Sequence, residues 1–537
     1  NRDVAELWAY HDGTKHSLAR LRADPHVLDW DILPRPFKVY PTLDPIPLAR
    51  DPTSTSDSPP PTTTNETAST FHRMGSQRPV LEALADDGSR TDDAGAPPVD
   101  VDLLAQLLYF TAGLLKRRSH PMGETFFRAA ACTGNLHHID LYVACSDLPG
   151  LDAGLYHFGP HDFALRRLRT GDPRAALVAA SADEPHVRDA PAILVLASTW
   201  WRNAWKYRSR TYRHAFWDAG TQLANLLALA AARRLPAHLV LGFADDAVNA
   251  LLGLDVEHEA ALALVALGRD ADLAPEAVHA APEALALETL PLSQREIAYP
   301  AIVTAHRASS LASPEEVAAW RRALPSDECA AAESAPLVPL DPCDEPVAET
   351  VETVILRRGS TRRFARAPIP LRALSTILRS VSRGVPADFL ATGAQRATPY
   401  LIVNAVDGLA PGTYAYDRSR DALLPLRAGN FRREAGFLGL GQQIPADAAV
   451  DVFWLSDLSS MLGELGSRGY RAAQLEAAIA GGKTYLAAYA LGLGASGLTF
   501  FDDDVTAFFS PHARGKSVMF LMAIGVRERT PRARGLG

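Results

Sequence analysis

The sequence predicts an α+β protein made of two tandem copies of one domain. Landmark residues of the first copy recur in the second at a constant spacing of 258 residues, as between positions 142 and 400. The pairs are Tyr142 and Tyr400, Gly154 and Gly412, Tyr156 and Tyr414, Gly171 and Gly429, Arg210 and Arg468, Tyr212 and Tyr470, and Phe243 and Phe501. A gap-free offset over about a hundred positions indicates a tandem duplication. In each copy, short apolar runs bounded by turn residues predict strands, and segments with 3.6-residue periodicity predict helices.

The same elements are expected in the same order in both copies. Apolar residues at Val101, Leu104 and Leu108 predict a first helix near 99–108, and the pattern recurs over 371–378. There follow a strand (192–197 or 448–455), a long helix (near 205–234 or 468–491) and a second strand (237–241 or 495–499).

Three segments lie outside the two copies. Residues 1–50 are rich in proline between Pro34 and Pro47, which predicts an extended strap across another surface. Residues 51–70 are almost all Ser, Thr, Pro, Asp, Asn or Glu and predict a flexible linker. Residues 271–348 predict a structured connector with a helix over 313–324 that Ser313 and Glu316 cap. The first domain then spans 71–270 and the second 349–537.

Composition narrows the class of protein. Hydrophobic residues make up 47% and charged residues 22%, as in a soluble globular protein, and a net charge of −8 argues against a general nucleic-acid binder. No run approaches the roughly 18 to 20 apolar residues of a membrane span. The four cysteines, Cys132, Cys145, Cys329 and Cys343, show neither CxxC pairing nor metal-ligand spacing. We therefore expect a cytoplasmic protein with no membrane segment and no metal site.

A basic turn over 357–364 is the strongest candidate binding element. It holds four arginines, with Arg358, Ser360 and Arg362 arranged to offer guanidinium and hydroxyl donors to a phosphate. Aligning the first helices of the two copies places the acidic stretch 87–93 at the equivalent position, where carboxylates would repel a phosphate. We expect a phosphate site in the second copy only. The alternative is a solvated basic turn.

With the duplication and this turn in view, the chain resembles the nitroreductase superfamily and, within it, the SagB-type azoline dehydrogenases of thiazole and oxazole peptide biosynthesis. The resemblance implies an FMN at the interface of two such domains, which here would form an intrachain pseudo-dimer compatible with a monomeric chain. It assigns the phosphate to Arg358, Ser360 and Arg362. Lys516 or Arg514, in the basic turn before the last strand, is expected to help.

A loop of the opposite domain lies beside the flavin ring in this family, with a pattern like Arg-x-Ala-Pro-Ser-Ala-Gly. The first copy keeps its arginine and glycine, and the resemblance assigns flavin contacts to Arg128, Cys132, Thr133 and Gly134. The second copy has Pro386 where the arginine would stand. Each copy thus keeps what the other has lost.

Lys206 and Tyr207 match a Lys-Tyr pair that the family's dehydrogenases are thought to use for proton transfer. On a continuous helix Lys206, Arg210 and Arg213 would share one face, and the alternative is that the aromatic neighbours are core and the basic residues a solvated stripe. Trp205, Phe216 and Trp217 are expected in the core, and for Lys206 and Tyr207 both interpretations stay open.

The functional prediction is an FMN-dependent oxidoreductase that moves hydride between FMN and a small-molecule or modified-peptide substrate, as in azoline oxidation. Two alternatives stay open. One is a flavin reductase fed by NAD(P)H, with O2 as a further redox partner. The other is a scaffold or partner-binding protein that kept the fold and lost the chemistry.

Overall fold

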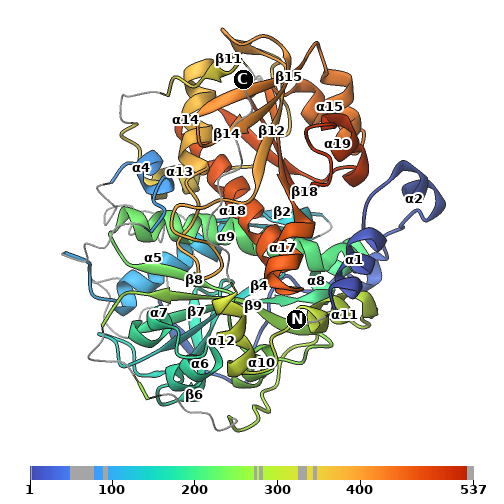
Figure 1. Cartoon of the computed structure of the whole chain (residues 1–537). Helices are drawn as coiled ribbons and strands as arrows, with labels where there is room; N and C mark the ends of the chain where they lie inside the picture. Colours follow the sequence, from blue (N-terminus) through green and yellow to red (C-terminus); the bar gives the residue numbers. More distant parts are fainter. Residues whose placement is uncertain are drawn as a thin grey trace, which may run out of the picture.

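The computed structural model describes residues 1, 3–48, 78–88, 95–121, 123–270, 275–276, 282–323, 336–342 and 347–528. The predicted linker over 51–70 and most of the acidic stretch 87–93 lie outside these residues. Figure 1 shows two domains, one above the other, each built on a sheet.

The two seven-stranded sheets have the same antiparallel topology. The strand orders are β1-β6-β5-β4-β7-β9-β8 and β10-β15-β14-β12-β16-β18-β17. The first sheet comprises β1 (Pro45–Pro47), β4 (Ile139–Cys145), β5 (Gly154–Gly159), β6 (Ala164–Thr170), β7 (Ala192–Thr199), β8 (Ala237–Val240) and β9 (Glu259–Leu267). The second comprises β10 (Val338–Pro339), β12 (Thr398–Val403), β14 (Gly412–Asp417), β15 (Ala422–Ala428), β16 (Val450–Ser456), β17 (Gly494–Leu498) and β18 (Ser517–Gly525). This repeated order confirms the predicted duplication and the α+β class.

Two long helices, α9 (Thr211–Ala232) and α18 (Arg468–Ala490), pack against each other through the middle of the molecule (Figure 1). Their crossing requires small residues. A Cβ added at Gly220 would lie 2.5 Å from the Cβ of Ala478, and one at Gly482 would lie 2.5 Å from the Cβ of Ala224. Gly220 and Ala478 are 258 positions apart, as are Ala224 and Gly482, so equivalent residues of the two copies meet at the crossing.

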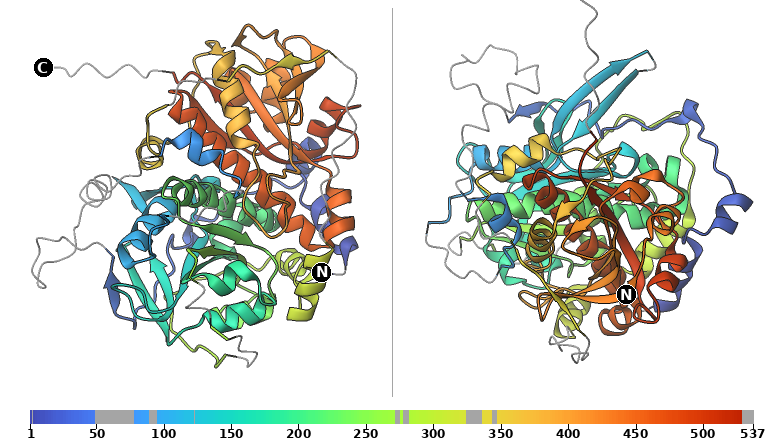
Figure 2. Two further views of the ribbon diagram at one scale, coloured as in Figure 1. Left: turned by 60° about the vertical axis from the view of Figure 1, so that its left-hand side comes forward. Right: turned by 90° about the horizontal axis from the view of Figure 1, so that it is seen from above.

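The remaining elements cover the sheets or connect them. They are α4 (Val80–Leu84), α5 (Val101–Ala112), α6 (Arg174–Ala180), α7 (Pro185–Asp189), α8 (Trp200–Tyr207), α10 (Asp245–Leu252), α13 (Val351–Arg357), α14 (Leu371–Val381), α15 (Arg432–Leu438), α16 (Gln443–Asp447), α17 (Leu458–Leu465), α19 (Asp502–Phe509), β11 (Ile369–Pro370) and β13 (Val406–Asp407), with short 3-10 turns at Trp30–Ile32, Thr133–Asn135 and Arg208–Arg210. A separate hairpin, β2 (Leu114–His120) with β3 (Gly123–Arg128), projects from the body as the pale-blue pair of arrows in the right-hand view of Figure 2.

The first copy's long helix differs from its prediction. The segment is broken where Arg208 adopts a left-handed φ of 52°, so α8 ends at Tyr207 and α9 begins at Thr211. Lys206 therefore shares no helical face with Arg210 and Arg213, contrary to the expectation, because periodicity carries no signal for a left-handed residue. The second copy's α18 is continuous as predicted.

The N-terminal segment is only partly extended, so the expectation of a strap without helix was wrong for its first half. Helices α1 (Val4–Gly13) and α2 (Leu18–Ala23) form before the first proline, Pro25. Side chains of α1 are buried: Tyr10 donates its hydroxyl to Ser209 O at 2.7 Å, and His11 lies against Tyr470. Beyond Pro25 the N-terminal segment crosses the first domain and leads into β1, at the edge of the first sheet.

The connector contains α11 (Pro300–Ala308), which packs on α1, and α12 (Pro314–Arg322). The second of these matches the predicted helix, including the cap, because Ser313 Oγ accepts from the backbone N–H of Glu316. In the described part of the chain, no helix combines the length and apolar character needed to cross a membrane.

Buried ion pairs join the two copies reciprocally. Arg210 and Arg213 of the first copy bind Asp502 of the second at 3.1 and 2.5 Å. Arg468 and Arg471 of the second copy bind Asp245 of the first at 2.8 and 2.6 Å. Although burial alone would raise the pKa of both carboxyls, the arginines hold each pKa below its usual range.

Candidate active site between the two domains

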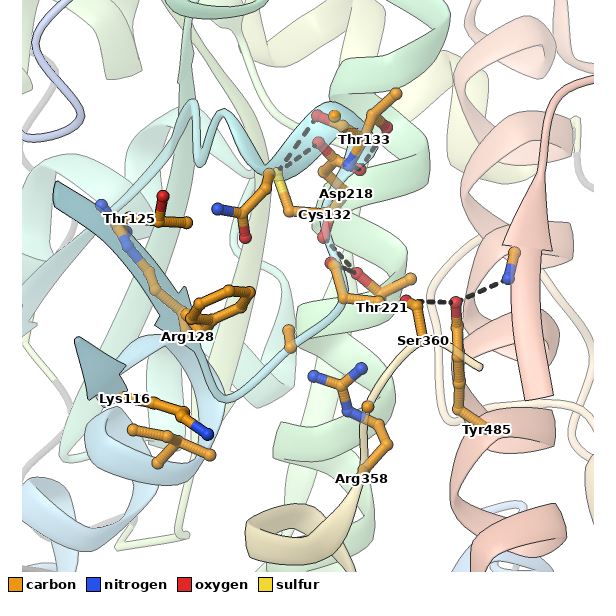
Figure 3. Close-up of a pocket in the computed structure, with 18 of the residues that line it drawn as sticks. Lys116, Thr125, Arg128, Cys132, Thr133, Asp218, Thr221, Arg358, Ser360 and Tyr485 are labelled. Carbon is orange, nitrogen blue, oxygen red and sulfur yellow. Dashed lines mark hydrogen bonds between the residues drawn. The ribbon is translucent and has the colours of Figure 1, made fainter. Parts of the chain in front are cut away.

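A cavity of about 1730 Å³ lies between the two domains, with walls from both (Figure 3). The second domain supplies the turn after α13, Tyr485 of α18 and the end of β17. The first supplies the β2–β3 hairpin, the loop that follows it, the end of α8 and part of α9. Of the sequence-predicted site residues, Arg358, Ser360, Arg362, Arg128, Cys132, Thr133, Gly134, Lys206 and Tyr207 all line this cavity.

The basic turn is fixed to the second domain's sheet. Ser360 forms a parallel bridge with Ala495, and Thr361 N donates to Ala495 O at 2.9 Å. The Ser360 hydroxyl lies 3.0 Å from the Tyr485 hydroxyl, which also accepts from Gly497 N (Figure 3). The turn is therefore held in place before any ligand binds.

Arg358 crosses to the other domain. Its Nη2 donates to Ala129 O at 2.7 Å, and its guanidinium carbon lies 5.3 Å from the Tyr485 ring centre. Its Nε is buried without a hydrogen-bond partner among the described residues, and burial lowers the pKa of this arginine. A guanidinium whose Nε is buried without a partner, and which has no carboxylate partner in the described part of the chain, suits an anion such as a phosphate.

Of the other basic residues predicted for this site, one lines the cavity and two do not. Arg362 is exposed and lines the cavity. Neither Lys516 nor Arg514 is part of the cavity wall. Lys516, just before β18, points its ammonium at Thr398 Oγ1, 3.4 Å away, and at the Tyr400 ring. The structure therefore does not bring these two residues to the cavity wall with Arg358 and Ser360.

Arg128 is anchored by the N-terminal segment. Its Nη2 donates to Pro36 O at 2.8 Å, and its guanidinium carbon lies 5.1 Å from the Phe37 ring centre. The side chain is 4% exposed, its Nε has no partner among the described residues, and burial, reinforced by Arg202, lowers its pKa to about 10. The N-terminal segment thus positions a cation in the cavity wall.

Asp218 holds the loop after Arg128. Its carboxylate accepts from Thr133 N at 2.8 Å, from Thr133 Oγ1 at 2.6 Å and from Cys132 Sγ at 3.0 Å (Figure 3). His138 Nε2 lies 2.9 Å from the same carboxylate. Burial and Asp218 raise the pKa of the Cys132 thiol, so this cysteine is a neutral hydrogen-bond donor and not a nucleophile.

Lys206 and Tyr207 are the last two residues of α8 and face the cavity. The Tyr207 hydroxyl packs on Gly134, whose φ is 61° and where an added Cβ would lie 2.7 Å from that hydroxyl. Burial, with Asp218 nearby, raises the pKa of Tyr207, so its hydroxyl keeps its proton. The Lys206 ammonium lies 5.4 Å from the Tyr207 ring centre.

Sequence reasoning missed Asp218, Tyr485 and the hairpin. A signal existed for Asp218: its equivalent 258 positions later is Glu476, whose carboxylate accepts from Arg396 N and Ala397 N at 2.6 and 3.1 Å. An acid on the central helix thus binds a loop of its own domain in both copies. Tyr485 has Leu227 as its equivalent and gave no such signal.

The position related to this cavity by the duplication is filled by protein. Pro386 lies against Gly88, where an added Cβ would be 2.5 Å from the proline Cβ. The Asp388 carboxylate accepts from Leu241 N and Gly242 N, each at 2.8 Å. Thr499, the second-copy equivalent of Leu241, lines the open cavity. At the corresponding place beside Leu241, the second-domain loop that carries Asp388 takes up the space.

A His–Glu group lies outside the cavity wall. Ligand atoms of Glu184, His186 and His238 come within 4.8 Å of one another. The two imidazoles are stacked nearly parallel, with ring centres 3.7 Å apart, and His186 Nδ1 already contacts Glu184 at 2.9 Å. Parallel rings do not converge on a common ion.

Comparison with known proteins agrees with this architecture. Residues 95–269 and 355–526 each match the nitroreductase family model. The chain is 22% identical over 172 residues to MJ1384 of Methanocaldococcus jannaschii, which bears a nitroreductase name; the match covers 32% of this chain and 82% of that protein. A crystal structure from Anabaena variabilis, also bearing a nitroreductase name, superposes with a TM-score of 0.75 at 24% identity, covering 97% of this chain and 99% of that one. An FMN-dependent nitroreductase from Clostridium difficile covers 32% of this chain and 86% of its own, at 15% identity and a TM-score of 0.22. With both halves matched, the chain belongs to the nitroreductase family.

Proposed function

We propose that the protein is an FMN-dependent oxidoreductase with one flavin site per chain, in the cavity between its domains. The observation that carries the proposal is the meeting of Arg358 and Ser360 from the second domain with Lys206 and Tyr207 from the first across one cavity. The pseudo-symmetric position is filled by Asp388 and its loop, which supports a single site.

The residues present fit such a cofactor. The unpartnered buried Nε of Arg358, with Ser360 and Arg362, would hold the phosphate. The loop from Arg128 to Gly134 and the end of β17 would lie beside the ring system. A cavity of about 1730 Å³ exceeds the roughly 300 to 1,000 Å³ of a typical ligand pocket, which leaves room for a substrate beside a cofactor.

When bound, FMN supplies two-electron redox chemistry by accepting or giving a hydride. The chain's part is to orient the reactants and handle the accompanying proton. Tyr207 keeps its hydroxyl protonated in a buried position beside Gly134, and Lys206 provides a cation next to it. These two residues are proposed as the proton-transfer pair.

For the substrate, oxidation of an azoline ring in a modified peptide is the specific reaction that the resemblance suggests. It requires reduction of the bound flavin by the substrate. A flavin reductase would instead take its electrons from NADPH or NADH. Mixing the oxidised protein anaerobically with each donor, and following bleaching of the flavin absorbance, separates the two.

The test of the proposal is the flavin content of the purified chain. We expect an oxidised-flavin absorbance spectrum and about one FMN per chain after release and quantification. A ratio near two would contradict the single site. Absence of flavin, even after incubation with free FMN, would overturn the proposal and favour a scaffold that lost the chemistry.

A further inference from the structure

The β2–β3 hairpin brings a run of basic side chains to the cavity wall. Lys116, Arg117 and Arg118 are consecutive on β2, all three are exposed, and all three line the cavity. Figure 3 shows Lys116 and Arg128 on one side of the cavity, across from Ser360 and Tyr485. The hairpin therefore faces the basic turn from the opposite wall.

Cations greatly exceed carboxylates in the described residues of this wall. The carboxylates are Asp162 and Asp218, and each is already bound, the first by Arg166 and the second by its loop. Arg117 pairs with Glu124 and Arg357 pairs with Glu349. The lining cations without a carboxylate partner among the described residues are Lys116, Arg118, Arg128, Lys206, Arg358 and Arg362.

This excess is local, because the whole chain has a net charge of −8. Like charges gathered in one cavity repel, and their repulsion is relieved when an anion binds among them. The FMN phosphate of the proposed function carries about two negative charges and is placed at Arg358 and Arg362. Arg128 belongs to the loop that the proposed function sets beside the flavin ring. Lys116, Arg118 and Lys206 then remain without a carboxylate partner among the described residues and without a part in holding the cofactor.

We propose that the substrate of this site carries a carboxylate or phosphate group, and that Lys116 and Arg118 bind this anion at the cavity mouth. The inference rests on the proposed function, since that function assigns Arg128, Arg358 and Arg362 to the cofactor and Lys206 to proton transfer. Arg118 presents a planar guanidinium that pairs bidentately with a carboxylate or phosphate, and Lys116 adds a point charge beside it. Cationic substrates would be repelled by the same wall.

The experiment is equilibrium dialysis of the protein as purified, at low salt, against 4-nitrobenzoate, 4-nitrophenyl phosphate and the neutral 4-nitrobenzamide. We expect at least one anion to bind about tenfold more tightly than the amide, as two charge contacts at a partly exposed site allow. Added salt should reduce this preference. The two anions distinguish carboxylate from phosphate recognition.

The double variant K116Q/R118Q tests the residues. It should lose the anion preference while the amide binds as before. Its matched control is R433Q, since Arg433 is an exposed arginine of α15 that does not line the cavity, and this variant should behave as wild type. Equal binding of anions and amide, or an anion preference that survives in the double variant, would overturn the inference.

Flavin content, read from the absorbance of each preparation, keeps the two proposals apart. Loss of the anion preference in K116Q/R118Q with unchanged FMN supports the hairpin as the substrate's anion site. Loss of FMN from the same variant would show that the hairpin serves the cofactor, which overturns this inference and leaves the proposed function standing. If the wild type contains no flavin, the proposed function is contradicted. The dialysis comparison still decides in that case whether Lys116 and Arg118 bind anions.

Discussion

Gly220 of α9 and Ala478 of α18 are equivalent residues of the two domains, and they meet where the central helices cross. A Cβ at Gly220 would also lie 2.9 Å from backbone atoms of α18, so the helices approach as closely as their backbones allow. Each helix contributes to one wall of the cavity, through Asp218 on α9 and Tyr485 on α18. The crossing therefore fixes the position of these two residues relative to each other.

The first prediction concerns this crossing. Gly220→Ala should lower the free energy of unfolding by about 1 to 3 kcal/mol, the usual cost of overpacking a core. The matched control is Gly463→Ala in α17, where an added Cβ meets nothing within 4 Å and helix propensity favours alanine. Urea unfolding of both variants checks the prediction, and equal stability of the two would contradict the close crossing.

The second prediction concerns the basic turn, which the proposed function assigns to the FMN phosphate. Arg358→Ala should weaken FMN binding about tenfold or more, because a charge-assisted hydrogen bond contributes roughly 1.5 to 3 kcal/mol. Arg362→Ala should act in the same direction. The equivalent change at Arg90, in the acidic stretch of the first copy, should leave the dissociation constant unchanged. Titration of apoprotein with FMN measures all three, and a similar loss at Arg90 would defeat the asymmetry between the copies.

The fold was predictable because its signals are local or repeated. Strands β7, β8, β16 and β17 and helix α18 fall within two residues of their predicted bounds, since apolar runs and the 258-residue offset mark them twice. The break at Arg208 and the helices of the N-terminal segment were not predicted. The break depends on the positive φ of one residue, Arg208. The two N-terminal helices were missed because the proline content of the whole segment argued against helix, although its prolines begin only at Pro25, after both helices.

The cavity was predictable in part. Arg358, Ser360, Lys206 and Tyr207 were placed by motif and do line it. Lys516 was proposed from a basic turn close in sequence to β18, but proximity along the chain does not fix the wall that a side chain faces. The hairpin β2–β3 was not predicted because β2 is mostly exposed and carries consecutive charges, without the alternation that marks a half-buried strand.

The third prediction is a pH dependence at the filled position. Burial raises the pKa of Asp388 to about 6 from a usual value of 3.8, despite two backbone donors that lower it. The folded state then holds the proton more tightly than the unfolded state, so the carboxyl's contribution to stability is present below pH 3.8 and is lost as the pH rises toward 6. Across that window the loss amounts to about 3 kcal/mol.

The variant Asp388→Asn isolates this effect because it cannot titrate. Relative to it, the wild type should become less stable between about pH 4 and pH 6 and then stay level. Urea unfolding of both proteins at several pH values checks this. A stability difference that does not change with pH would show that the backbone donors of Leu241 and Gly242 keep Asp388 ionised throughout.

The last prediction concerns Lys206 and Tyr207, on which the proposed proton transfer depends. Lys206→Ala and Tyr207→Phe should keep folding and FMN content while slowing substrate-dependent flavin reduction about 10²-fold or more, the scale of lost general acid–base catalysis. Tyr207→Phe is the sharper variant, because it removes one oxygen and leaves the ring packed against Gly134. Single-turnover reduction rates and flavin-to-protein ratios separate three outcomes. A slow rate with full flavin supports proton transfer, and an emptied site would mean that the residue holds the cofactor. A wild-type rate with full flavin would show that both side chains only line the wall, and the proton would then have to reach solvent by another route.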